Sequence, residues 1–298
     1  MPFQFDSTPT IHQALTLAAE YLDQSQLCFG HGTDNPWDEA VVLLLWALGM
    51  EDDPGTHILE TNLDHDSALT FQQAINRRVD EKIPAAYITG EAVFCGLKFH
   101  VDERVLVPRS PIGELIQKDY HPWLVEQPKT ILDLCCGSGC IGLAAAMYSS
   151  NTQVTLADLS QDALTVAERN RARHKLEQRV TVCSGDLFSA VAGQRFDLIL
   201  CNPPYVDRED LSAMPEEYQH EPPMGLGSGE DGLDITRRIL RESKDYLSPG
   251  GNLILEVGNS WENLEYAYPQ FSFMWLAMES GGEGITILNE RELSSGAF

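Results

Sequence analysis

Apolar residues recur at helical spacing through the first 80 residues of the chain. Ile11, Leu15 and Ala18 lie three or four positions apart, and similar patterns follow twice downstream. Residues at this spacing share one face of a helix, so the pattern predicts amphipathic helices that pack on one another. Asp66 and Ser67 are the predicted N-cap residues of the third helix. The predicted helices cover 11–22, 41–48 and 69–79.

Residues 84–107 change to the alternating pattern of β-structure. Apolar and polar side chains alternate over 86–94 and again over 97–101, on either side of Cys95-Gly96. Alternation places successive side chains on opposite faces of a strand, and a short glycine-containing turn joins such strands. The pattern therefore predicts a β-hairpin, followed by a helix from Ile112.

From Thr130 onward, short apolar runs alternate with helical stretches. Apolar runs of strand length are typical of parallel strands that are covered on both faces. This order predicts an α/β domain with a doubly wound parallel sheet. The predicted strands cover 131–134, 154–156, 180–182, 196–200 and 253–257, and the predicted helices between them cover 162–176 and 233–247. The last two apolar runs, 271–278 and 285–288, flank Ser280-Gly281-Gly282 and are predicted to end the sheet as an antiparallel hairpin.

The charge of the chain narrows the choice of partners. Its 298 residues include 45 acidic and 20 basic side chains, which gives a formal net charge of −25. Such a surface repels phosphate and anionic lipid, so we expect no direct nucleic-acid partner and no membrane partner. The seven cysteines are odd in number and no secretory leader is recognisable, which predicts reduced thiols in the cytoplasm. Without paired C-x-x-C motifs, no metal site is expected.

A glycine-rich loop follows the first predicted strand of the sheet. Gly137-Ser-Gly139-Cys-Ile-Gly142 matches a G-x-G-x-x-G pattern, in which glycines let the backbone approach a ligand at the start of a helix. The loop alone is compatible with NAD or FAD. Asp133 argues against both, because its carboxylate would repel a pyrophosphate. The same carboxylate suits the ammonium group of S-adenosylmethionine.

Two more acidic residues end the next two predicted strands. Asp158 has the position of a residue that accepts hydrogen bonds from a ribose diol, and Asp186 can accept one from an adenine amino group. Each could instead cap a helix, since aspartate is common at N-caps. Three acids at three successive strand ends, together with the glycine loop, predict a cofactor site. No P-loop signature is present, so a nucleoside triphosphate site is not expected.

The fourth predicted strand runs directly into Asn202-Pro203-Pro204-Tyr205. The two prolines fix the backbone, and the Asn202 amide oxygen and the carbonyl after it are hydrogen-bond acceptors. Two such acceptors can hold a planar –NH₂ group while the Tyr205 ring covers its face. Such a group is either a carboxamide or an exocyclic base amine, and held beside a sulfonium methyl it needs no base before attack, because its proton can leave afterwards. The segment therefore predicts methyl transfer to nitrogen by proximity.

Together these motifs resemble the class I S-adenosylmethionine-dependent methyltransferases that modify amide or amino nitrogen, and among them the protein N5-glutamine methyltransferases. The resemblance covers essentially the whole chain and implies S-adenosylmethionine as cofactor. It also implies a helical substrate-recognition domain over 1–83, a β-hairpin linker over 84–108 and a seven-stranded methyltransferase domain over 109–298. The implied cofactor contacts are Asp133, Cys135, Cys136, Gly137, Ser138, Gly139, Asp158, Asp186, Leu187 and Asn202, and the implied acceptor contacts, the catalytic residues, are Asn202, Pro203, Pro204 and Tyr205.

Two branches of that family differ in substrate. One methylates the glutamine of the Gly-Gly-Gln motif in peptide release factors, and the other a glutamine of the third large-subunit ribosomal protein. Segments 87–92, 96–99, 101–116 and 220–222 resemble the ribosomal-protein branch. At Cys135 the wider superfamily usually has glycine. The resemblance to the ribosomal-protein branch implies that the partner is a basic ribosomal protein. An acidic helical domain would attract such a protein.

Several alternatives stay open from the residues. The Asn-Pro-Pro-Tyr segment also permits a release-factor glutamine or, less readily, the N6 amine of adenine in DNA, which requires base flipping. The same type of fold also serves oxidoreductases and silent binding modules. The loop over 207–230 either walls the acceptor site or is a solvated surface loop. Arg109 is expected to pair with an acid near the hairpin, in a structural role.

Overall fold

The computed structural model describes residues 2–50, 54–279, 281–296 and 298, and its chain divides into two units. Unit 1 comprises the chain up to Ala92 together with Pro215–His220. Unit 2 comprises Val93–Met214 and Glu221–Phe298. The segment between the fourth and fifth strands of the predicted sheet therefore contributes residues to both units. The predicted domain boundaries at 83 and 108 stay a prediction.

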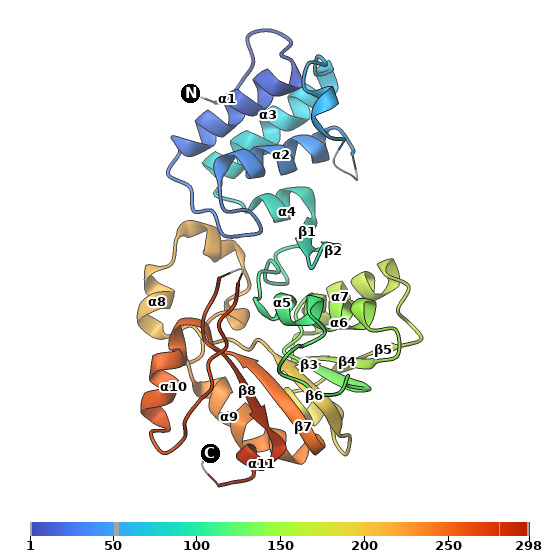
Figure 1. Ribbon diagram of the computed structural model, residues 1–298. Coiled ribbons are helices and arrows are strands. Elements are labelled where there is room, and N and C mark those ends of the chain that lie inside the picture. Colours follow the sequence, from blue (N-terminus) through green and yellow to red (C-terminus); the bar gives the residue numbers. More distant parts are fainter. Residues whose placement is uncertain (1, 51–53, 280, 297) are drawn as a thin grey trace. The chain divides into compact units, whose positions relative to one another are not determined.

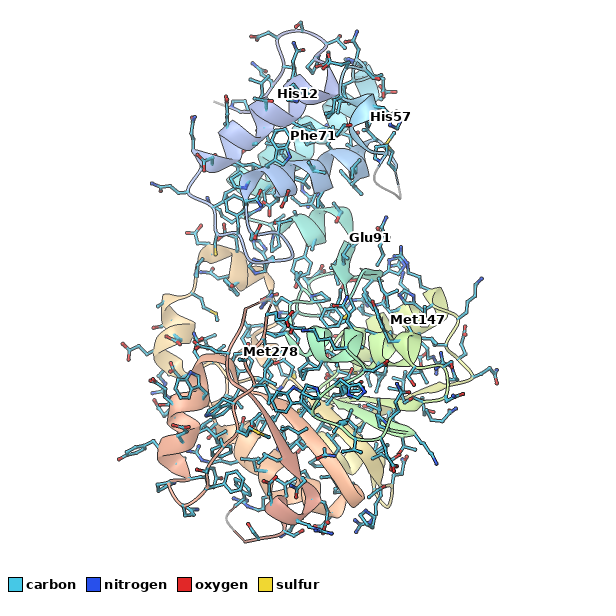
Figure 2. The ribbon with its side chains drawn as sticks, in the orientation of Figure 1. His12, His57, Phe71, Glu91, Met147 and Met278 are labelled. Carbon is cyan, nitrogen blue, oxygen red and sulfur yellow. The ribbon has the colours of Figure 1, made fainter. Side chains whose placement is uncertain are left out.

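Unit 1 is built from helices (Figure 1), and their apolar side chains form one core. The three predicted helices are confirmed. Phe71 is fully buried among them (Figure 2). The helical elements of this unit are α1 (Ile11–Asp23), α2 (Pro36–Ala47), η1 (Thr56–Ile58), α3 (His65–Asp80), α4 (Ala85–Thr89) and η3 (Glu216–His220).

The start of α3 corrects one prediction. Its N-cap is Asp64, whose carboxylate accepts hydrogen bonds from the backbone N–H groups of Asp66 (3.1 Å) and Ser67 (3.0 Å). The predicted caps, Asp66 and Ser67, are thus the residues that are capped. The reason is that a cap residue keeps an extended backbone, and Asp64 is the residue with that conformation here.

The predicted β-hairpin is present but begins later in the chain than expected. Strands β1 (Glu91–Phe94) and β2 (Leu97–His100) form a two-stranded sheet. Both residues of the turn, Cys95 and Gly96, have positive φ (51° and 72°), as a two-residue hairpin of type I′ requires. The expectation of a strand over 86–89 was wrong, because α4 occupies those residues and ends at Gly90, whose φ is 72°.

Unit 2 contains a mixed six-stranded sheet in the order β5-β4-β3-β6-β7-β8 (Figure 1). All neighbours are parallel except β7 and β8. From β3 the chain builds outward to β5, then returns to the other side of β3 with β6, so the order reverses between β3 and β6. The strands are β3 (Thr130–Leu134), β4 (Gln153–Asp158), β5 (Val180–Ser184), β6 (Phe196–Cys201), β7 (Leu247–Glu256) and β8 (Ile285–Asn289).

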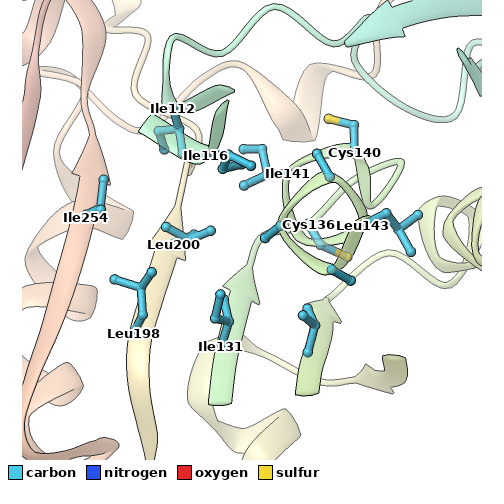
Figure 3. Close-up of a cluster of buried hydrophobic side chains, with 14 of the residues drawn as sticks. Ile112, Ile116, Ile131, Cys136, Cys140, Ile141, Leu143, Leu198, Leu200 and Ile254 are labelled. Atoms are coloured by element: carbon cyan, nitrogen blue, oxygen red, sulfur yellow. The ribbon is translucent and has the colours of Figure 1, made fainter. Parts of the chain in front are cut away.

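Helices cover both faces of this sheet, which confirms the predicted α/β class. Ile131, Leu198, Leu200 and Ile254 point to the face that is covered by α5, α6 and α7 (Figure 3). The residues between them point to the other face, covered by α9, α10 and α11. The helical elements are α5 (Ile112–Gln117), α6 (Cys140–Tyr148), α7 (Gln161–Arg173), η2 (Leu187–Val191), α8 (Arg208–Ala213), η4 (Pro223–Gly225), α9 (Asp234–Glu242), η5 (Ser243–Asp245), η6 (Gly258–Ser260), α10 (Trp261–Ala267) and α11 (Glu290–Leu293).

The sheet has six strands in the described residues where seven were expected. The run 271–278 forms no strand and joins the sheet through an isolated antiparallel bridge between Trp275 and Thr286. Its aromatic side chains, Phe271, Phe273 and Trp275, pack on one another, which accounts for the apolar pattern without a strand. Ser280 of the predicted turn lies outside the described residues. No helix within the described ranges has the length and apolar character that a membrane crossing requires.

A buried ionic cluster ties the segment Pro215–His220 to the helices of unit 1. The Arg78 guanidinium on α3 contacts Glu39 (Nε to Oε1, 2.6 Å) and Glu217 (Nη1 to Oε1, 3.2 Å), and all three side chains are at most 3% exposed. Nη2 of Arg78 also donates to the Cys28 carbonyl (2.8 Å), and the Cys28 N–H donates to Glu217 (2.9 Å). A single guanidinium thus holds two buried carboxylates and a chain segment far away in sequence.

Removing that guanidinium should destabilise unit 1. We expect Arg78→Met to lower the free energy of opening of α3 and Pro215–His220 by ~3–5 kcal/mol, because two buried carboxylates lose their cation. Native-state hydrogen exchange would measure the loss. Arg77→Met, one position earlier on the exposed side of α3, is the matched control and should change protection little. Equal protection in both variants would contradict this account.

Candidate active site

The reversal of strand order brings the sequence motifs of unit 2 to one edge of the sheet. Leu134 at the end of β3 pairs with Ala157 of β4 on one side and with Cys201 of β6 on the other. The glycine loop follows Leu134, and Asn202 follows Cys201. Ligands of open α/β sheets bind at such a switch point, beyond the carboxyl ends of the strands.

The loop after β3 has the conformation that its glycines allow. Gly137 and Gly139 have positive φ (54° and 78°), and α6 begins directly after Gly139. Cys135 also has positive φ (62°), a conformation that glycine adopts most easily. This accounts for the glycine that the wider superfamily has there. A Cβ at Gly142 would lie 2.8 Å from Asp133 Cβ, so this glycine lets α6 pack on the strand.

The remaining loop residues are tied to their neighbours. Cys136 is buried and its N–H donates to the Ala157 carbonyl (3.1 Å). Ser138 is buried as well, and its carbonyl accepts a hydrogen bond from Asn170 on α7 (3.0 Å). The loop is therefore held in place by both β4 and α7.

Asp133 lies beneath this loop and is fully buried. Its Oδ2 accepts the N–H of Gly142 (2.8 Å), and Oδ1 has no hydrogen-bond partner among the residues that the structure describes. Burial raises the pKa of Asp133 to about 7; the Gly142 N–H lowers it and the Asp158 charge raises it further. A buried carboxylate oxygen without a partner is unstable unless a ligand donates to it.

Asp158 and Asp186 differ in their surroundings. Asp158, at the end of β4, accepts the N–H of Gly137 (2.9 Å) on one oxygen and that of Ser160 (2.8 Å) on the other. A carboxylate has about four acceptor positions, so further donors can still bind. Asp186 is exposed and forms an ion pair with Arg238 (2.9 Å), a residue that the sequence patterns did not identify. Leu187 beside it is buried and has a φ of 48°.

The Asn202–Tyr205 segment leaves β6 at the same edge. The Asn202 side chain is half-buried and makes no hydrogen bond within the described part of the chain. The Tyr205 carbonyl accepts a hydrogen bond from Ser260 (2.7 Å), and the Tyr205 hydroxyl donates to Glu256 (3.3 Å). A Cβ at Gly258 would lie 2.5 Å from the Tyr205 ring, so this glycine leaves the space that the ring fills.

Sequence reasoning missed the groups around Tyr205. Glu256 is a buried residue within an apolar strand, and Ser110 contacts it from a loop far earlier in the chain (2.5 Å). The expected acidic partner of Arg109 is Glu221, which binds the guanidinium through both oxygens (2.5 and 2.6 Å). Glu221 also accepts the N–H of Val107 (2.9 Å). Ser110 and Glu256, Arg109 and Glu221, and Val107 and Glu221 are each more than a hundred residues apart, so no local pattern could have shown these contacts.

The loop predicted over 207–230 divides between the two units. Its first part contains α8, its middle is Pro215–His220 of unit 1, and the part from Glu221 belongs to unit 2. A parallel bridge between Val206 and Gly227 closes the unit 2 portion of the loop. That this loop walls the acceptor site stays a prediction.

The fold and this edge of the sheet define a class I methyltransferase. A family model described as "Methyltransferase small domain" matches residues 118–216. A protein named "Ribosomal protein uL3 glutamine methyltransferase" from Bordetella pertussis is 41% identical over 288 residues, which cover 96% of this chain and 97% of that protein. One of the same name from Francisella tularensis is 40% identical over 286 residues, which cover 95% and 91%. The chain therefore belongs to the family of these glutamine methyltransferases.

Family membership decides between the classes that the sequence left open. The protein is an enzyme whose methyl donor is S-adenosylmethionine, and it is neither an oxidoreductase nor a silent binding module. Among solved structures, a methyltransferase from Pyrococcus furiosus is 20% identical, with a TM-score of 0.48, and the match covers 65% of this chain and 89% of that one.

The residues at the switch point fit this cofactor. S-adenosylmethionine carries an ammonium group and no phosphate, so it can donate to the buried Asp133 oxygen that otherwise lacks a partner. In the glycine loop, a Cβ added at Gly137 would meet nothing within 4 Å, so the backbone there is open to a ligand. A dinucleotide would instead place its pyrophosphate close to the negative charges of Asp133 and Asp158.

The raised pKa of Asp133 should appear in the stability of the protein. Since the folded protein favours the protonated carboxyl, this group's contribution is fully present below pH 3.8 and is lost as pH rises through about 7. Asp133→Asn cannot ionise. The quantity to compare is the stability difference between the two proteins, which is the unfolding free energy of the wild type minus that of Asp133→Asn. We expect this difference to fall by ~1–4 kcal/mol between pH 5 and pH 8.

Urea unfolding at both pH values, without cofactor, would measure this difference. Asp162→Asn changes an exposed aspartate on α7 and serves as the control. Its unfolding free energy should differ from that of the wild type by the same amount at both pH values. If Asp133→Asn behaved like this control, Asp133 would ionise in the folded protein as it does in the unfolded chain.

Proposed function

We propose that this enzyme transfers a methyl group from S-adenosylmethionine to the side-chain amide nitrogen of a glutamine in ribosomal protein uL3. One observation carries the proposal. The β3–β6 pairing brings the strand ends that lead into the glycine loop and into Asn202-Pro203-Pro204-Tyr205 to one edge of the sheet, which supports a site where a planar amide and the cofactor would meet. The names of the relatives that match nearly the whole chain support the substrate.

In this proposal the acceptor segment holds the glutamine amide. The Asn202 amide oxygen and the neighbouring proline carbonyl accept the two amide hydrogens, and the Tyr205 ring covers the face of the amide. Pro203 and Pro204 fix the backbone so that these acceptors are in place before the substrate binds. That the Asn202 side chain has no partner of its own within the described residues supports the assignment.

The opposite side of the site is proposed to hold the cofactor. Asp133 receives the ammonium group, Asp158 the ribose diol, and Asp186 or Leu187 the adenine ring. The loop of Cys135, Cys136, Gly137, Ser138 and Gly139 follows the backbone of the ligand, and Asn202 contacts both the cofactor and the acceptor. Of these assignments, Asp133 has the strongest support, because its unpartnered oxygen requires a donor.

The residues also account for the course of the reaction. The cofactor, when bound, supplies an electrophilic methyl group on a sulfonium. Asn202 would keep the amide nitrogen aimed at that methyl group, which the bound cofactor would supply for transfer. An amide nitrogen is a poor nucleophile, so orientation and proximity carry much of the rate. One amide proton leaves to solvent afterwards, which is why the site needs no general base.

Mass spectrometry of the reaction product tests the proposal. Unmodified uL3 incubated with the enzyme and labelled S-adenosylmethionine should gain one methyl group on one glutamine. A release factor with its Gly-Gly-Gln motif and an adenine-containing DNA duplex are the alternative substrates in the same assay, and both should stay unmodified. A methyl group on either of these, with none on uL3, would replace the proposed substrate.

Two variants separate cofactor binding from transfer in that assay. Asp133→Ala should abolish the rise in melting temperature that S-adenosylmethionine causes. Asn202→Ala should keep most of the rise, because Asp133 and the glycine loop still hold the cofactor, and should lose at least a hundredfold in turnover, on the order expected when a substrate is misoriented. If Asn202→Ala turned over normally, its proposed role would be wrong.

The charge of the helical part supports a basic protein as the partner. Residues 1–100 contain 15 acidic and 4 basic side chains, and unit 1 includes most of them. We propose that unit 1 recognises the substrate and that its charge speeds the encounter with basic uL3 in the cytoplasm.

This steering should depend on salt. The association rate of enzyme and uL3 should fall about tenfold or more between 50 mM and 500 mM NaCl, because ions screen the attraction. Stopped-flow fluorescence would measure it, and a rate that does not change with salt would argue against steering. Methyl transfer to a short neutral peptide containing the acceptor glutamine should show no such dependence.

A further inference from the structure

Glu256, a buried glutamate, lies beside the acceptor segment and has no role in the proposed methyl transfer. Glu256 is the last residue of β7, and Leu255 before it pairs with Cys201 at the end of β6. Its side chain is only 4% exposed. It therefore lies next to the point where the Asn202–Tyr205 segment begins.

Both oxygens of Glu256 accept a hydrogen bond from a different part of unit 2. The Ser110 hydroxyl donates to Oε2 (2.5 Å), and the Tyr205 hydroxyl donates to Oε1 (3.3 Å). Ser110 is itself held, because its oxygen accepts the N–H of Ile112 at the start of α5 (3.2 Å). The carboxylate thus links the acceptor segment to a segment that precedes the sheet in sequence.

The Ser110 side of this link is anchored a second time. Arg109, next to Ser110, forms the two-oxygen ion pair with Glu221, and Glu221 also accepts the Val107 N–H. The backbone around Ser110 is therefore fixed on both sides. Glu256 can then act as a rigid support for whatever it holds.

The contact with Glu256 determines where the outer end of the Tyr205 ring lies. The Tyr205 backbone is held by Ser260, and Gly258 leaves room for the ring. The hydroxyl is the polar end of the ring, and its bond to Glu256 sets the ring's direction within that room. A carboxylate is suited to this because it only accepts, and both of its neighbours donate.

We propose that Glu256 is a positioning residue for methyl transfer: its carboxylate holds the Tyr205 hydroxyl, so that the ring keeps the orientation in which it covers the acceptor amide. Ser110 holds the other oxygen of the carboxylate in turn. The inference rests on the proposed role of Tyr205 toward the acceptor, and it adds a protonation requirement to it.

The requirement follows from the groups that face Glu256. Burial raises the pKa of Glu256 to about 7, while the bonds from Ser110 and Tyr205 and the charge of Arg109 lower it. The Cys201 thiol on the neighbouring strand is influenced by the Glu256 charge, and its own pKa is raised well above its usual value, chiefly by burial. Once protonated, the Glu256 carboxyl must donate one hydrogen, so one of its two neighbours loses its acceptor.

Kinetics of single and double variants test the inference. In the wild-type enzyme, kcat should rise with pH through about 7 as Glu256 ionises. Glu256→Gln and Tyr205→Phe should each lower kcat about tenfold, the loss expected for one hydrogen bond, with unchanged KM for the cofactor and no such pH dependence. The double variant should be no worse than either single variant, because both remove the same contact.

A spectroscopic readout separates this inference from the proposed function. With tyrosine labelled with ¹³C at Cζ, the Tyr205 signal, identified by its absence in Tyr205→Phe, should shift with pH around 7 in the wild type and stay constant in Glu256→Gln. No acceptor is needed for this measurement. If uL3 gained no methyl group but the signal titrated, the substrate would be wrong and the Glu256–Tyr205 coupling would stand.

Thr286→Val is the matched control. Thr286 lies on β8 opposite Leu255, and its buried hydroxyl has no hydrogen-bond partner in the described ranges. The variant should leave kcat and its pH profile unchanged. Normal kcat with the wild-type pH profile in Glu256→Gln, multiplying effects in the double variant, or a Tyr205 signal that does not titrate would each overturn the inference. All variants should keep the cofactor-induced rise in melting temperature, which excludes a failure to fold.

Discussion

The parallel pairing of β3 with β6 is the constraint on which the rest of the catalytic unit depends. These strands are not consecutive in sequence, yet Leu134 and Cys201 are partners at the same edge of the sheet. The glycine loop leaves one strand and the Asn-Pro-Pro-Tyr segment leaves the other. If this pairing slipped by one residue, side chains of β6 would exchange faces, and Asn202 would move away from the loop. Helices on both faces prevent such a slip, because they bury both sets of strand side chains.

Buried charge is distributed differently in the two parts of the protein. In unit 1, Arg78 neutralises Glu39 and Glu217, and the cluster ties a returning segment to the helices. At the edge of the sheet, no cation among the described residues forms an ion pair with the buried Asp133 or Glu256, and burial raises the pKa of each to about 7. Unneutralised buried carboxylates destabilise a fold. Their presence beside the glycine loop and the acceptor segment is consistent with groups that are kept for ligand binding and positioning.

Much of the fold could be predicted because its patterns are local. Apolar runs marked β3, β4 and β6, and Cys95-Gly96 marked the hairpin turn. The errors arose where a local pattern had a second explanation. Residues 86–89 alternate, but they form a helix that ends at Gly90. The run 271–278 is apolar because its aromatic side chains pack together, and it adds only one bridge to the sheet.

By itself the sequence determined the class of the sheet, the glycine loop, the acceptor segment and the resemblance to a methyltransferase family, because each depends on neighbouring residues. The tertiary structure decided the rest. Only folding brings Ser110 and Tyr205 to the two oxygens of Glu256, or divides the loop after β6 between the two units. Contacts between distant segments depend on how strands order and helices pack, and no periodicity along the chain records that order.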